Sequence, residues 1–224
     1  MRATLLALLA AVGTPVGVLA AQGVTGRPGP RIVLPRDHEV VLARSAAPPS
    51  VHAGARVWVF ADGRYVVVDS GTTGVECYVS RSWPQSLEPH CFDEEGAHSI
   101  MRMEMRRSEL LHAGTGAEAV DAEIAAGLAA GTYRLPQRPA MSWMLSSAQV
   151  LYSDDGRRVG AWRPHVMIYF PYLTPAMLGM GSNGDVRAGI VVQPGTPVSN
   201  LMIVVPDAVD PEPVRTSRGE ARRP

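Results

Sequence analysis

The chain has 224 residues and carries 21 basic and 21 acidic side chains, so its formal net charge is zero. A balanced charge gives no reason to expect nucleic acid or an anionic membrane surface as a partner. All 21 basic residues are arginine. Without lysine the chain can hold neither a Schiff-base lysine nor the lysine of a phosphate-binding P-loop.

The first 21 residues have the pattern of a secretory signal peptide. Arg2 precedes an uncharged apolar run that ends in small residues at Ala20 and Ala21, as a signal-peptide cleavage site requires. Gly13 and Pro15 interrupt this run well before the roughly 20 apolar residues that a membrane-spanning helix needs. We therefore expect an exported protein, periplasmic or extracellular, with no membrane span.

The mature chain is predicted to begin with a flexible lead-in over residues 22–35, which is rich in Gly and Pro. A single domain over residues 36–206 follows, and the polar tail over 207–224 is expected to be disordered. In the domain, Pro35 precedes a short helix over 36–45. Strands are then predicted over 56–60, 65–69 and 75–79, joined by an Asp-Gly turn and a Gly-Thr-Thr-Gly turn into a three-stranded meander.

The only two cysteines, Cys77 and Cys91, are expected to form a disulfide because an exported protein meets an oxidising compartment. The segment between them contains Pro84 and Pro89 and is predicted to be rich in turns, with few ladder hydrogen bonds of its own. The alternative is a metal site that uses both thiols together with nearby histidines.

After Cys91 the pattern becomes helical. One helix is predicted from about residue 95 to 112, and a second begins at a Thr-x-x-Glu capping box, Thr115 to Glu118, and ends at Gly131. Strands are then expected over 141–152, 166–170, 187–193 and 200–205, with turns at 154–156 and 194–197 and a loop over 171–185. This order predicts an α+β fold, with a mainly antiparallel sheet and an inserted helical pair.

A binding site is expected around His165. On a strand, His165 and Tyr169 lie on the same face, and Asp93 and Tyr172 are candidate neighbours. We also expect the apolar loop over 171–185 to form the rim of the site, because binding residues concentrate on loops held by a rigid scaffold. The alternative is that this loop folds back and covers an open face of the sheet. A buried histidine with satisfied ring nitrogens is the alternative interpretation of His165.

Two further groups of residues raise the question of metal binding. His90, Cys91, Asp93 and His98 lie close in sequence, but no motif of zinc-ligand spacing accompanies them. The carboxylates after Cys91 are better interpreted as helix caps. Methionines at 101, 103 and 105 could bind Cu(I), although such residues more often fill gaps in a core. We expect no cofactor and no resident metal.

Short motifs scattered over residues 45–206 resemble a family of uncharacterised bacterial exported proteins. In this sequence the motifs are Ser45–Pro48, Gly71–Cys77, Cys91–Asp93, Met141–Leu145, Pro164–Met167 and Gly195–Pro197. Thr73 stands where that family usually has asparagine. The resemblance implies export and one compact domain, and it implies no activity.

The favoured function is therefore a non-enzymatic exported module that binds a small molecule or a partner protein. Two alternatives remain open. The first is a hydrolase that uses His165 with a carboxylate, so that enzymatic activity stays undecided, and the second is a metal-handling protein.

Overall fold

The computed structural model describes residues 32–81, 86–153, 157–181 and 183–213, and it is an α+β fold as the sequence predicts. The helices are α1 (Arg36–Arg44), α2 (Pro49–His52), α3 (Glu94–Ala97), α4 (Ile100–His112), α5 (Ala117–Ala129) and the 3-10 helix η1 (Pro175–Leu178). The strands are β1 (Arg56–Ala61), β2 (Arg64–Asp69), β3 (Glu76–Ser80), β4 (Ser86–Phe92), β5 (Ala140–Met144), β6 (Val150–Tyr152), β7 (Arg158–Gly160), β8 (His165–Tyr169), β9 (Ile190–Val192) and β10 (Asn200–Val204).

The main sheet runs in the order β2-β1-β3-β4-β5-β8-β10-β9, and β6 and β7 form a small extension from β4. All pairs are antiparallel except β1 with β3. The predicted meander is therefore wrong: β3 lies beside β1 on the side opposite to β2. Gly71 permits this return, because it has φ +65° and a Cβ there would lie 2.4 Å from the backbone nitrogen of Arg56.

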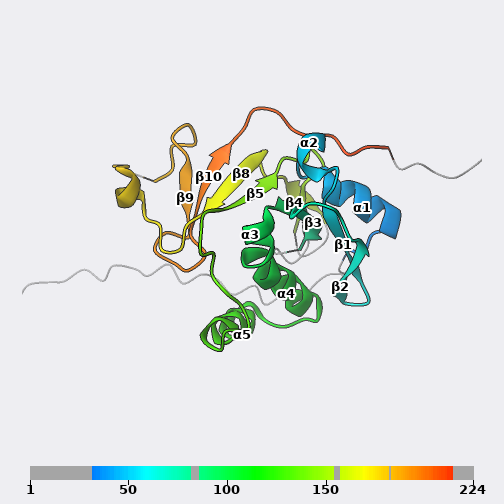
Figure 1. Ribbon diagram of the computed structural model, residues 1–224, viewed down its shortest axis with the longest axis horizontal. Helices are drawn as coiled ribbons and strands as arrows, with labels where there is room; N and C mark the ends of the chain where they lie inside the picture. Colours follow the sequence, from blue (N-terminus) through cyan, green and yellow to red (C-terminus); the bar gives the residue numbers. More distant parts are fainter. Residues whose placement is uncertain (1–31, 82–85, 154–156, 182, 214–224) are drawn as a thin grey trace, which may run out of the picture.

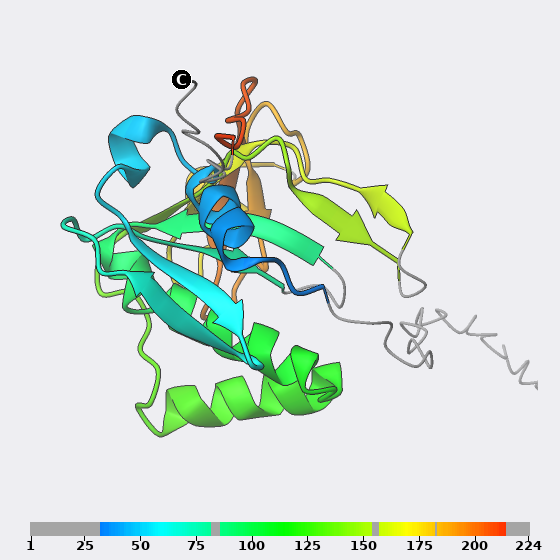
Figure 2. The same cartoon turned by 90° about the vertical axis from the view of Figure 1, so that its right-hand side faces the viewer.

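Helices cover both faces of the sheet, as Figure 1 shows. α1 packs against β1, β3 and β4 on one face, while α3 and α4 contact β2 to β5 on the other. α5 packs on the outer side of α4 (Figure 1), and β6 and β7 project from the sheet, away from α4 and α5 (Figure 2). Most of the large buried side chains, including Tyr78, Phe92 and Met101, form one core between the sheet and α4.

Charged groups buried beneath the helices are paired. Glu39 of α1 is fully buried and accepts two hydrogen bonds of 3.0 Å from Arg81, and a third from the backbone nitrogen of Phe60 at 2.9 Å. On the α4 face, Glu76 accepts hydrogen bonds from Trp58 and from Arg102. These bonds compensate the cost of removing the carboxylates from water.

Three predicted elements end differently from the expectation. The helix expected over 95–112 is divided into α3 and α4, because Ser99 leaves helical geometry and its hydroxyl donates to the Glu95 carbonyl at 2.6 Å. The N-cap of α5 is Gly116 and no side chain caps it, so the Thr115–Glu118 capping box does not form. The strand expected over 141–152 is two strands, β5 and β6, separated by a turn.

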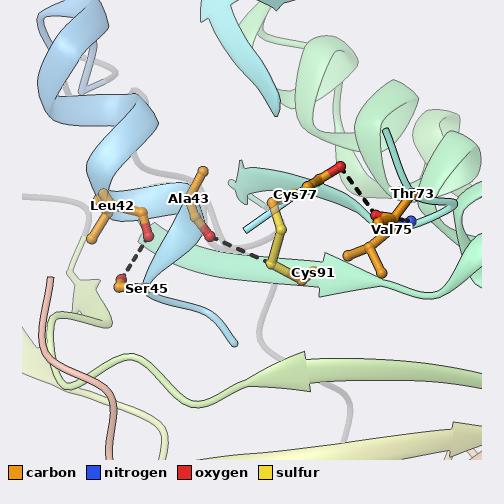
Figure 3. Close-up of a disulfide and its surroundings, with 8 residues drawn as sticks. Leu42, Ala43, Ser45, Thr73, Val75, Cys77 and Cys91 are labelled. Atoms are coloured by element: carbon orange, nitrogen blue, oxygen red, sulfur yellow. Dashed lines mark hydrogen bonds between the residues drawn. A yellow bond between two sulfur atoms is a disulfide. The ribbon is translucent and has the colours of Figure 1, made fainter. Parts of the chain in front are cut away.

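Cys77 and Cys91 form a disulfide, as predicted, and they face one another across β3 and β4 with Cα atoms 4.1 Å apart (Figure 3). Both sulfurs lie in the core beneath α1, where the Ala43 carbonyl oxygen approaches Cys91 Sγ at 3.6 Å. The prediction of few ladder hydrogen bonds between the cysteines is wrong, because residues 76–80 pair with 88–92 in continuous register. The part of the predicted turn-rich segment around Pro84 lies outside the described residues.

Pro89 fits into β4 for a geometric reason. A short Cα–Cα distance marks Cys77 and Cys91 as a non-hydrogen-bonded pair, and the pair Val79 and Pro89, two residues along, is of the same type. The backbone nitrogen of Pro89 therefore points away from β3. On that side β4 pairs with β6 before Pro89 and with β5 after it, so the missing N–H removes no ladder hydrogen bond.

The described part of the predicted tail is bound to the domain. The backbone of Val209 donates to the Leu145 carbonyl at 2.7 Å and accepts from Ser147 at 2.9 Å. This differs from the disorder expected from residue 207. The predicted signal peptide, most of the lead-in, the turn at 154–156 and the tail beyond 213 lie outside the described residues.

Candidate functional site

A cavity of about 330 Å³ lies on the α4 side of the sheet, beyond the region that α4 covers closely. Its floor is formed by the strands β3, β4, β5, β8 and β10, with β9 at one margin and Glu104 of α4 at another. A cavity of this size is at the lower end of the range for small-molecule sites.

Strand alternation selects which side chains face the cavity. Every second residue of β8 lines it, which brings His165, Met167 and Tyr169 together. The partner strands contribute the side chains opposite these residues. Met144 of β5 faces His165, and Asn200 of β10 faces Tyr169. The cavity is thus built on five paired strands rather than on loops.

The disulfide fixes the polar margin of the cavity. Cys77 and Cys91 lie on the α1 face of β3 and β4, so the residues next to them in each strand face the opposite side. Ser80 and Glu88 are direct cross-strand partners on that side, and both line the cavity. The covalent bond therefore holds the register that places Glu88 opposite Ser80.

His165 is oriented by the backbone. Its Nδ1 atom lies 2.6 Å from the carbonyl oxygen of Arg163, which can only accept a hydrogen bond, so Nδ1 carries the proton. Burial lowers the pKa of His165, and the hydrogen bond to Arg163 opposes this shift. The neutral ring thus leaves Nε2 as an acceptor, on a side chain that is 4 % exposed.

Two buried polar atoms at the cavity have no hydrogen-bond partner among the described residues. They are Nε2 of His90 and Oδ1 of Asn200, and each residue is only 5 % exposed. The amide nitrogen of Asn200 makes one long bond, 3.5 Å to the Val198 carbonyl. Burial lowers the pKa of His90 well below its usual value, and His165 lowers it further. An unsatisfied buried polar atom carries a desolvation cost that a ligand can relieve.

Glu104 reaches the cavity from α4. Burial raises the pKa of its carboxyl group, Arg107 opposes the shift and the Glu88 carboxylate adds to it. Within the part of the chain that the structure describes, Glu104 forms no hydrogen bond or ion pair. Glu88, in contrast, accepts a hydrogen bond of 2.7 Å from the indole N–H of Trp162.

Two of the four predicted site residues, His165 and Tyr169, line the cavity, and Asp93 and Tyr172 do not. Asp93 caps α3: its carboxylate accepts from the backbone nitrogens of Gly96 at 2.8 Å and Met141 at 3.1 Å. Tyr172 is 55 % exposed and has φ +66°. No described residue of the 171–185 loop lines the cavity, and Gln193 and Val198, between β9 and β10, form that margin instead.

The acidic and methionine-rich segments have structural contacts. Glu95 accepts a hydrogen bond of 2.6 Å from Arg134, which lowers its pKa to about 2 together with the backbone nitrogen of Gln137. Met101, Met103 and Met105 are all buried in the core around α4. No group of three or more His, Cys, Asp or Glu side chains within the described ranges could hold a metal ion.

The sequence analysis missed Glu88, Glu104 and Asn200 as members of the site, and it considered His90 only as a metal ligand. Alternation within 86–92 was the available signal for Glu88 and His90, but Pro89 made the segment resemble a turn. Glu104 had no local signal, because only the packing of α4 on the sheet brings it to the cavity.

Comparisons of the chain with protein-family models, with curated proteins and with solved structures find no match. Among the helices of the described residues, none has the length and apolar character needed to cross a membrane.

Proposed function

We propose that this protein is an exported binding module that takes up a small molecule in the cavity between α4 and the sheet. The observation that carries the proposal is the pair of buried polar atoms at one cavity, His90 Nε2 and Asn200 Oδ1, which have no partner among the described residues. Such atoms cost free energy in the folded state unless something binds them. A ligand that forms hydrogen bonds with these two atoms would offset this cost.

Binding is favoured over hydrolysis by the hydrogen bond at His165. A histidine base in a catalytic triad is oriented by a carboxylate at the nitrogen remote from the nucleophile. Here Nδ1 is held by the backbone carbonyl of Arg163. Ser80 is the serine of the described cavity lining, and no hydrogen bond joins it to His90 or His165 in the described structure.

Export is part of the proposal and rests on three observations. The first 21 residues have the pattern of a signal peptide, Cys77 and Cys91 form a disulfide of the kind that persists in oxidising compartments, and the chain resembles uncharacterised bacterial exported proteins. Mass spectrometry of the protein secreted by a bacterial host tests it. The expected mature chain begins next to Ala20 or Ala21, and an uncleaved chain that stays in the cytoplasm would contradict export.

A thermal-shift screen of the oxidised protein against small metabolites tests the binding function, with calorimetric titration of each compound that raises the melting temperature. We expect His165→Ala to lose binding and Tyr172→Ser, which changes an aromatic residue outside the cavity, to bind like the parent. Val192→Trp is the second variant, because it fills the cavity margin from β9 and leaves His165 in place.

Two results would overturn this proposal. Compounds that bind all three variants as tightly as the parent would place the site elsewhere. Conversion of a bound compound into products, lost in His165→Ala, would instead support the hydrolase alternative.

A further inference from the structure

Several of the polar atoms in the lining of the cavity are hydrogen-bond acceptors. Nε2 of neutral His165 accepts, because its Nδ1 donates to Arg163. Oδ1 of Asn200 accepts and has no protein donor within the described residues. The carboxylates of Glu88 and Glu104 are acceptors when ionised. A ligand that fits these atoms must bring hydrogen-bond donors.

The charged side chains in the described lining of the cavity are acidic. Its described lining includes two carboxylates and no arginine, although arginine makes up every basic residue of the chain. A second hollow, which shares Glu104 with the cavity, does contain Arg107, but Asp121 pairs with that guanidinium at 2.7 Å. A positively charged ligand would therefore be attracted to Glu104, which forms no hydrogen bond or ion pair within the described residues, and an anionic ligand would be repelled by it.

The remaining walls are apolar and aromatic. Met144, Met167 and Met202 form much of the floor, and adaptable thioether side chains accommodate varied apolar shapes. Tyr169 adds an aromatic ring that is almost fully buried, and Trp162, 46 % exposed, adds a second one whose N–H donates to Glu88. Aromatic faces beside carboxylates are favourable surroundings for an organic cation.

Taken with the proposed function, on which this step rests, the geometry points to a small organic ammonium ion with a compact apolar body as the ligand of the cavity. The ammonium group donates to Glu104 and to the acceptors of His165 and Asn200. The apolar body lies over the methionine floor. The ligand thus supplies the donors that the buried acceptors lack.

Three probes of one shape but different charge test this inference: phenethylamine, 2-phenylethanol and phenylacetate. Isothermal titration of the oxidised full chain is expected to give the tightest binding for the amine, weaker binding for the alcohol and none for the carboxylate. Equal or tighter binding of the alcohol or of phenylacetate would overturn the ammonium assignment and leave the binding function standing. Failure of the amine to bind would overturn the assignment as well. The binding function itself falls only if the metabolite screen also yields no ligand that depends on His165.

Glu104→Gln provides the matched variant, because it removes the charge and keeps the shape. Its affinity for phenethylamine is expected to fall at least about tenfold, since hydrogen bonds to charged groups are the stronger ones. Affinity for the alcohol should stay within about twofold, because no charge is lost from a neutral contact. Glu118→Gln, at an exposed position of α5, makes the same change of net charge and should bind like the parent. Parent-like binding of the amine by Glu104→Gln would contradict the role of the carboxylate.

Discussion

α4 packs over two regions of the sheet. In one region the buried charged groups are paired, and in the other, at the cavity, buried polar groups lack partners among the described residues. In the packed region, Glu76 beneath α4 is held by Arg102, just as Glu39 of α1, on the opposite face of the sheet, is held by Arg81. One half-turn along α4 from Arg102, Glu104 faces the cavity with no hydrogen bond or ion pair in the described structure. The same helix thus completes a charge pair at one end of β3 and leaves a carboxylate available at the other.

The difference between the two regions distinguishes polar groups that stabilise the fold from polar groups that serve a binding site. Paired carboxylates in the packed region stabilise one arrangement of helix and sheet. Removing one partner leaves the other charge buried without compensation, and this destabilises the fold. Unsatisfied groups at the cavity, such as His90 and Asn200, cost stability in the free protein. Proteins commonly accept such a cost where a site must bind.

The largest effect is expected for Arg81→Met. This change leaves the Glu39 carboxylate fully buried without its cation, which typically costs about 3–5 kcal/mol. Urea unfolding of the oxidised protein measures the loss. Arg187→Met is the control, because the ion pair of Arg187 with Asp185 is exposed and its loss should leave stability unchanged. Equal stability of the two variants would show that the buried pair contributes nothing specific.

The disulfide lies on the α1 face of β3 and β4, opposite the two regions, and its removal should have the next largest effect. Replacing both cysteines by alanine opens a loop with a sequence separation of 14, for which the chain-entropy model gives about 3 kcal/mol. Because the bond also holds Glu88 opposite Ser80, ligand affinity should fall together with stability. Thiol titration of the unfolded, unreduced parent should find no free thiol. A stable double variant with unchanged affinity would remove the disulfide from the account of the site.

A smaller effect is expected for the pH dependence that His90 contributes. Burial lowers its folded-state pKa well below the usual 6.5, so the unfolded chain takes up a proton first as the pH falls. Stability from this group is complete above about pH 6.5 and declines below it. Glu104, whose pKa is raised by burial, contributes to the pH dependence in the opposite sense. Unfolding free energies at pH 7.5 and 5.5 should therefore differ less in His90→Gln than in the parent, and an equal difference would mean that His90 does not titrate as described.

Much of the fold could be predicted from local patterns. The helix over 36–45, the Asp62-Gly63 hairpin and the final hairpin follow from Pro35, from turn residues and from alternation, and the structure confirms them. The parallel pairing of β1 with β3 could not be predicted, because it depends on the close approach of Gly71 to Arg56 rather than on either strand.

Only the site residues that lie on a single strand could be predicted from the sequence. His165 and Tyr169 share a face of β8 by simple alternation. Asn200 reaches the cavity through the pairing of β10 with β8, and Glu104 reaches it through the packing of α4 on the sheet. Neither contact could be predicted from the residues that neighbour Asn200 or Glu104 in the sequence. Asp93 lies near a cysteine and two acidic residues, which suggested chemistry, yet its carboxylate caps α3 and accepts from the Met141 nitrogen.

Two asparagines allow the central claim to be tested most directly. Asn183 is satisfied: its amide donates to the Val191 carbonyl at 2.7 Å and accepts from the Val191 nitrogen at 2.8 Å. Oδ1 of Asn200 is buried at the cavity without a partner among the described residues. The measurement is the free energy of unfolding of Asn183→Leu and Asn200→Leu, each compared with the parent. The account predicts that Asn183→Leu destabilises by about 1–2 kcal/mol, while Asn200→Leu is neutral or stabilises by up to about 1 kcal/mol and loses ligand binding. If Asn200→Leu instead destabilises the protein as much as Asn183→Leu, then Asn200 serves the fold, and the claim that the cavity retains unsatisfied groups for a ligand is wrong.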